Sequence, residues 1–134
     1  MRKAQLKRSI AGSADNVFGH VTIPHYGAIN ENSPKRFADD YYGLFKIVEE
    51  GMCRQYYLGF DVPILIARFG WIWTDDFVNS VGRRKGTIFK LMDRDGKPLV
   101  RHDVYVDDAV QEVLLSLQED EAVGTDFIFS AAAR

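Results

Sequence analysis

Tyr42 and Lys46 are the residues of this 134-residue chain whose types and spacing best suit proton-transfer chemistry. They lie four positions apart, so on a helix their side chains share one face. A phenol is a weak acid or base at neutral pH, but an ammonium group within about 6 Å favours the phenolate. Such a phenol can exchange a proton with a substrate hydroxyl while hydride leaves or arrives at the same carbon. The alternative is an exposed helical pair without chemistry, because this spacing also arises by chance.

A helix from Asp39 or Asp40 to about Leu58 is expected to carry this pair. Either aspartate can cap its start, Gly59 follows its expected end, and apolar residues recur inside it at helical spacing: Leu44, Ile47, Val48, Met52 and Tyr56. The apolar run 62–69 (VPILIARF) has the length and composition of a buried central parallel strand. A helix followed by a buried strand is the second half of a βαβ unit.

The segments before this unit are predicted from turn-forming residues. A strand over residues 7–11 is expected to lead into a polar turn from Gly12 to Asn16. Prolines and a run of polar residues break every regular pattern in residues 20–40, which predicts a long surface loop. Long loops in compact domains are often functional.

The segments after the unit have a different composition. Beyond Trp73 the chain is polar and punctuated by glycine, and two strands are expected around the turn Asp95-Gly96. Asp107 and Asp108 can cap a second amphipathic helix, and residues 126–130 have the composition of a further strand.

Composition and charge exclude several classes of protein. A net charge of -2 and a pI near 5.9 argue against a protein that holds nucleic acid by charge. Neither a membrane-spanning run nor an export signal is evident, and the single cysteine, Cys53, fits a reducing cytoplasm. The histidines His20, His25 and His102 lack metal-ligand spacing, so we expect loop or surface residues and no metal.

Three segments occur in the order found in the extended short-chain dehydrogenases, which include nucleotide-sugar epimerases and dehydratases: DDYYGLFK, VPILIARFGWIW and LVRHDVYVDDAVQEVLLSL. NENSP at 30–34 and VFG at 17–19 also resemble elements of that family. The resemblance implies an α/β fold. Residues 1–74 would form the second half of a doubly wound, Rossmann-type parallel sheet. Residues 75–134 would form part of a small substrate-binding lobe, with a return strand and helix near 103–118.

The resemblance also implies roles for individual residues. Tyr42 would be the catalytic acid/base beside the cofactor, and Lys46 would favour its phenolate and bind the nicotinamide ribose. Ser13 would be the third catalytic residue and would orient the substrate oxygen. The usual position of that serine is held by Ala14, and Phe45 stands where many members have serine. An ordinary turn serine is the alternative reading of Ser13.

Two further sites follow from the resemblance. Arg68 and Gly70 lie where relatives have a strand end and loop that pass the nicotinamide, and Gly70 permits close approach of backbone to ligand. Equally, Phe69, Trp71 and Trp73 in that segment can simply be core residues. Arg101 stands where sugar-nucleotide members have an arginine that binds the substrate diphosphate; the alternative is a solvated strand-end arginine.

The function implied is NAD(P)-dependent oxidoreduction, epimerisation or dehydration of a sugar or sugar-nucleotide substrate, with NAD or NADP as cofactor and a homodimer as the full-length form. The sequence lacks the glycine-rich turn that binds the cofactor pyrophosphate. We therefore expect an internal fragment of such an enzyme. The alternative is a non-catalytic cofactor-sensing or protein-interaction module on the same fold.

Overall fold

The computed structural model describes residues 6–20, 27–36, 41–83 and 102–130. A three-stranded parallel sheet forms its centre, in the order β1-β2-β5, from β1 (Ser9–Ala14), β2 (Ile64–Phe69) and β5 (Asp126–Phe129). The long helix α1 (Tyr41–Phe60) connects β1 to β2, which makes the predicted βαβ unit. The predicted α/β fold with a parallel sheet is confirmed.

A second, smaller sheet continues directly from the first. After β2 the chain passes through Gly70 into β3 (Trp71–Trp73), which pairs in parallel with β4 (Asp103–Tyr105). The helix α2 (Asp75–Arg83) follows β3, where the sequence predicted only a polar, glycine-punctuated segment. Of the segment expected to form two strands around Asp95-Gly96, only the end from residue 102 is described, and it forms β4. The division at residue 74 stays a prediction.

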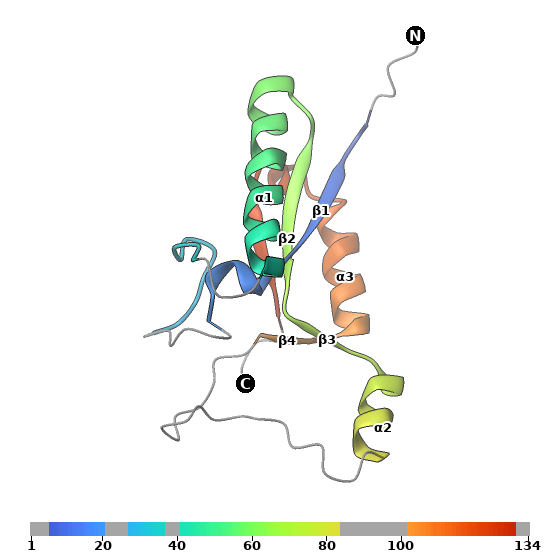
Figure 1. Cartoon of the computed structure of the whole chain (residues 1–134). Coiled ribbons are helices and arrows are strands. Elements are labelled where there is room, and N and C mark those ends of the chain that lie inside the picture. The colour runs from blue at the N-terminus through green and yellow to red at the C-terminus, as the bar shows by residue number, and fades with distance from the viewer. Residues whose placement is uncertain (1–5, 21–26, 37–40, 84–101, 131–134) are drawn as a thin grey trace.

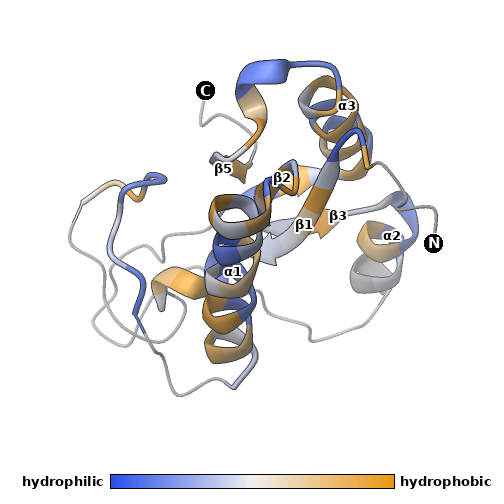
Figure 2. Cartoon of the chain, turned by 90° about the horizontal axis from the view of Figure 1, so that it is seen from above, coloured by the Kyte–Doolittle hydropathy of each residue, from blue (hydrophilic) through white to orange (hydrophobic). Residues whose placement is uncertain are grey.

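Helices cover both faces of the main sheet. Figures 1 and 2 show α1 on one face and α3 (Val106–Ser116) on the other. Because side chains alternate along a strand, Leu65 and Ala67 face the α3 side, where they form an apolar core with residues from the C-terminal part of the chain: Val113, Ala122, Phe127 and Phe129. The opposite side of β2 faces α1.

Of the five apolar residues at helical spacing in α1, only Leu44 and Ile47 are partly buried. Val48, Met52 and Tyr56 are each more than half exposed, whereas Gly43 and Glu50 are buried. The physical reason lies on β2, because the buried Arg68 ion-pairs with Glu50 and so turns a polar stripe of α1 towards the sheet. The helix also extends to Phe60, so Gly59 lies within it rather than beyond its end.

Two other boundary predictions are wrong. Gly12 belongs to β1, and the chain turns only afterwards, in the 3-10 helix η1 (Asp15–Phe18), because Gly12 to Ala14 continue the parallel pairing with β2. Asp107 and Asp108 do not cap α3. They lie in its first turn, where negative charge favours the exposed backbone N–H groups.

Candidate functional site

Tyr42 and Lys46 lie in the first turns of α1, beside the carboxyl end of β1. Lys46 Nζ donates a hydrogen bond to the backbone oxygen of Gly12 at 2.7 Å, which fixes this end of the helix to the strand. The same Nζ lies 5.8 Å from the centroid of the Tyr42 ring. Ligands of parallel α/β sheets bind at the carboxyl ends of the strands, so both residues lie at the expected edge of the sheet.

The environment of this pair keeps the lysine charged and the tyrosine accessible. Glu49 accepts a hydrogen bond from Lys46 Nζ at 2.7 Å, and this contact raises the pKa of Lys46 above its ordinary value. Tyr42 is 52% exposed. Lys46 is therefore a charged ammonium, and it lies beside the exposed phenol of Tyr42.

Ser13 points into the protein. Its Oγ donates a hydrogen bond to Glu50 Oε1 at 2.6 Å, and both residues are buried. Ala14, which holds the position usual for the family's serine, is the last residue of β1. The catalytic role of Ser13 stays a prediction, and its observed partner is a carboxylate beneath α1.

Arg68 belongs to a buried ionic network that also contains Glu50. Its guanidinium donates from Nε to Glu50 Oε1 at 2.9 Å and from a terminal nitrogen to Glu50 Oε2 at 3.0 Å, and it also pairs with Asp126. Lys35 Nζ lies 2.5 Å from Glu50 Oε2. Burial alone would raise the pKa of Glu50, but hydrogen bonds from Arg68, Lys35 and Ser13 hold it below the ordinary value.

In this network the partners of Arg68 are the carboxylates of Glu50 and Asp126. The predicted contact of Arg68 with the cofactor stays a prediction. Burial would lower the pKa of Arg68, and its bonds to Glu50 and Asp126 raise it, so the guanidinium stays charged although it is fully buried. Glu50 itself was missed by sequence reasoning. The available signal was its spacing, four residues after Lys46 on the same helix.

Gly70 allows two segments of backbone to approach one another. A Cβ added at Gly70 would lie 1.7 Å from the backbone oxygen of His102, which also accepts a 2.8 Å hydrogen bond from the N–H of Trp71. The close approach at Gly70 is therefore between β3 and the residue before β4, and the predicted approach to a ligand stays a prediction. Trp71 is half exposed and forms an edge contact with Phe77.

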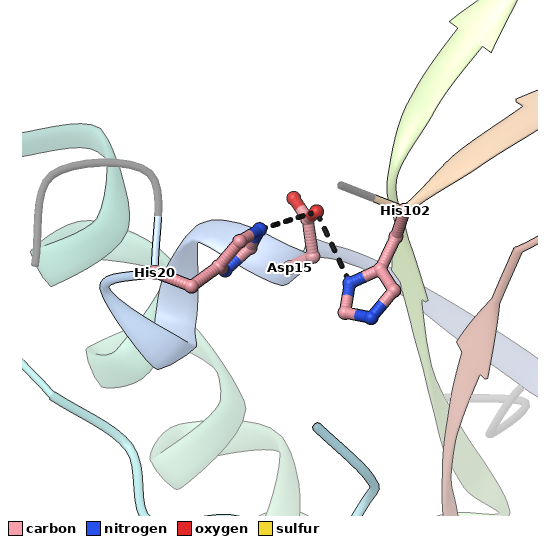
Figure 3. Close-up of side chains that lie close together, drawn as sticks. All are labelled: Asp15, His20 and His102. Carbon is pink, nitrogen blue, oxygen red and sulfur yellow. Dashed lines mark ion pairs between the residues drawn. The ribbon is translucent and has the colours of Figure 1, made fainter. Parts of the chain in front are cut away.

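The structure brings three residues together that the sequence did not connect: Asp15, His20 and His102 (Figure 3). Asp15 Oδ2 lies 3.2 Å from His20 Nε2 and 3.4 Å from His102 Nδ1. Burial by itself raises the pKa of Asp15, but the two neighbouring imidazoles more than offset this and lower it. His20 lies in a turn, which fits the expected loop, but it is buried at 5% exposed and is not a surface residue. His25 and the predicted substrate ligand Arg101 lie outside the described residues.

No protein-family model matches the chain, and no curated protein matches it. Its fold is nevertheless close to solved structures. A short-chain dehydrogenase/reductase superfamily protein from Agrobacterium tumefaciens with bound NAD matches at a TM-score of 0.72 and 20% identity, over 92% of this chain and 48% of that chain.

Two nucleotide-sugar enzymes are similar in the same way. The dTDP-glucose 4,6-dehydratase from Bacillus anthracis in complex with NAD has a TM-score of 0.74 at 16% identity, over 94% of this chain and 41% of that chain. The UDP-glucuronic acid 4-epimerase from Bacillus cereus, in complex with UDP-glucuronic acid and NAD, has a TM-score of 0.68 at 21% identity, over 96% and 41%.

These matches confirm the predicted fold class. The chain has the fold of part of a Rossmann-type short-chain dehydrogenase, and it spans less than half of each of the three chains. Among the described residues, no helix has the length and hydropathy to cross a membrane.

Proposed function

We propose that this chain carries the proton-transfer residues of an NAD(P)-dependent enzyme of the epimerase/dehydratase type, acting on a sugar or sugar-nucleotide substrate. The observation that carries the proposal is the position of Tyr42 and Lys46 together at the carboxyl edge of a parallel sheet, with Lys46 bound to β1 through Gly12. The three structurally similar proteins are each complexed with NAD, which supports this cofactor class.

The residues present fit the nicotinamide half of such a cofactor. An ammonium has three N–H donors, and the contacts of Lys46 with Gly12 and Glu49 use two of them. The third is available for a ribose hydroxyl. When bound, NAD(P) supplies the hydride acceptor or donor.

The chain's own contribution is to hold and move a proton at the Tyr42 oxygen. Tyr42 is half exposed at the sheet edge, so a substrate hydroxyl can approach its phenol. The Lys46 ammonium, 5.8 Å from the centroid of the ring, places a positive charge beside the oxygen that would exchange this proton. This is general acid-base catalysis at a carbinol carbon.

A non-catalytic cofactor-sensing or interaction module is the second candidate. One observation favours it: the hydroxyl of Ser13 donates its hydrogen bond to the buried Glu50. Such a module would bind the cofactor and show no turnover.

Association of two copies also remains part of the proposal. Along α1 several large apolar side chains are more than half exposed, and exposed apolar surface of this kind marks interaction sites: Tyr41, Tyr42, Phe45, Val48, Met52, Tyr56, Leu58 and Phe60. This supports the predicted homodimer. Cytoplasmic location stays a prediction.

The test compares Tyr42→Phe with Tyr41→Phe, its exposed neighbour on the same helix. In the full-length form, the assay measures binding of NAD+ and NADP+ and turnover of a panel of UDP- and dTDP-sugars. Removal of the phenolic oxygen should lower turnover by about two to four powers of ten while binding is nearly unchanged, since acid-base catalysis commonly contributes that much. Tyr41→Phe should behave as the parent.

Lys46→Met completes the test. It should weaken cofactor binding as well as turnover, because it removes both the proposed ribose contact and the positive charge. Turnover of Tyr42→Phe within threefold of the parent would contradict the catalytic assignment. Cofactor binding without turnover in the full-length form would favour the second candidate.

A further inference from the structure

The cluster of Asp15, His20 and His102 has the composition of a metal site. One carboxylate and two imidazoles are ligands that Zn²⁺ takes in proteins, and three protein ligands leave one coordination position for water or another group. Their candidate ligand atoms all lie within 4.8 Å of one another. Figure 3 shows both imidazoles converging on one carboxylate from different segments of the chain.

The distances around Asp15 match those expected between zinc ligands. Two atoms bound to one tetrahedral Zn²⁺ at about 2.0–2.1 Å lie about 3.3–3.4 Å apart. Asp15 Oδ2 is 3.2 Å from His20 Nε2 and 3.4 Å from His102 Nδ1. Both carboxylate-imidazole distances therefore agree with a shared ion. To bind it, the ligating nitrogens of His20 and His102 need only move closer to one another, because they already lie within 4.8 Å.

Unsatisfied nitrogen atoms give a second, independent indication. Among the described residues, His102 Nδ1 and His20 Nδ1 are buried and have no hydrogen-bond partner. The side chain of His20 is 1% exposed and that of Asp15 is 5% exposed. Buried polar atoms without a partner are costly, and a bound ion is one of their recognised explanations. A metal ion would satisfy the His102 nitrogen that faces the carboxylate.

The backbone holds the three residues in place. Asp15 begins η1 directly after β1, and Gly19 ends that turn with a φ of 67°, which directs the chain into His20. His102 is anchored because its oxygen accepts the hydrogen bond from Trp71. Ligands on such fixed segments need little rearrangement to bind an ion.

We propose that Asp15, His20 and His102 bind one divalent transition-metal ion, with Zn²⁺ as the best match to this ligand set. The ion links the turn after β1 to the residue that precedes β4. This site goes beyond the proposed function, because proton transfer by Tyr42 requires no metal.

The experiment titrates the full chain, freed of any affinity tag and treated with chelator, with ZnCl₂ in a calorimeter. One equivalent should bind, and Co²⁺ in its place should give the visible absorption bands of tetrahedral coordination. His20→Ala and His102→Ala should each weaken Zn²⁺ binding more than about a hundredfold, since loss of even an outer-shell partner costs ten- to a hundredfold.

Two control variants address the other candidate ligands. Cys53→Ser removes the single thiol, and Asp120→Asn removes an exposed carboxylate, so both should keep the affinity of the parent. In the unmodified chain, Zn²⁺ should shift the NMR resonances of His20 and His102, a readout that needs no variant to fold. Absence of stoichiometric binding, or full affinity in both histidine variants, would overturn the proposal.

Discussion

The chain contains two buried carboxylates with opposite surroundings. Glu50 is 1% exposed, and its carboxylate forms ion pairs with Arg68 and Lys35 and accepts a hydrogen bond from Ser13. Its negative charge is therefore balanced by cationic side chains of the protein. Asp15 is 3% exposed, and among the described residues its ion-pair partners are the imidazoles of His20 and His102, whose Nδ1 atoms lack hydrogen bonds. The cluster around Glu50 stabilises the fold, whereas the cluster around Asp15 has nitrogen atoms that could bind a ligand. Burial of a carboxylate therefore indicates a functional site only when its partners leave hydrogen-bonding or ligating atoms unsatisfied.

The largest effect is expected from Glu50→Gln. It removes the charge that balances the fully buried Arg68, and breaking a buried ion pair typically costs about 3–5 kcal/mol. Because Asp126 still pairs with Arg68, we expect the lower end, about 3 kcal/mol, in the free energy of unfolding measured with denaturant. The adjacent Glu49→Gln is the control: its half-exposed pair with Lys46 should contribute less than about 1 kcal/mol. Equal losses of unfolding free energy in Glu50→Gln and Glu49→Gln would contradict the structural role assigned to the buried Glu50.

An intermediate effect is expected from Gly70→Ala, because Gly70 lies against His102 of the Asp15 cluster. The added Cβ would overlap the His102 carbonyl, and overpacking of this kind costs about 1–3 kcal/mol. Because His102 must move, Zn²⁺ affinity should fall together with the melting temperature. Gly51→Ala offers a matched substitution in open space inside α1, where alanine should stabilise by up to about 1 kcal/mol. A Gly70→Ala protein as stable as its parent would mean that β3 and His102 are further apart.

The smallest effect is expected from Asp15→Asn in metal-free protein. The substitution removes one buried carboxylate charge, and the amide oxygen of asparagine can still accept a hydrogen bond. We expect a loss of about 1 kcal/mol or less in unfolding experiments with chelator present. A loss as large as that of Glu50→Gln would show that Asp15 is part of the structural framework and is not reserved for a ligand.

The βαβ unit could be predicted from the sequence because its signals are local. Apolar spacing marks α1, and the continuous run that ends in β2 is typical of a buried strand. The side of α1 that faces the sheet could not be predicted in this way. It depends on Arg68, which is in β2 and pairs with Glu50 across the layers.

The Tyr42/Lys46 pair was predicted because it lies within one helix, where spacing alone brings side chains together. The Asp15 cluster could not be found by the same reasoning, since His102 reaches it from a segment far along the chain. Helix α2 was missed for a different reason: its sequence, DDFVNSVGR, is mostly polar and contains a glycine, so its few apolar residues at helical spacing were not interpreted as a helix.

The central position of β2 has a consequence for how the chain folds. Ser9 of β1 pairs with Ile64, and Ile66 pairs with Asp126 of β5, so both partners are more than fifty residues away along the chain. No hairpin can start this sheet, and loop entropy must be lost before its first hydrogen bonds form. Proteins dominated by such distant pairings fold more slowly than those with local contacts. The helices α1 and α3 are then expected to form early, with sheet assembly as the slow step.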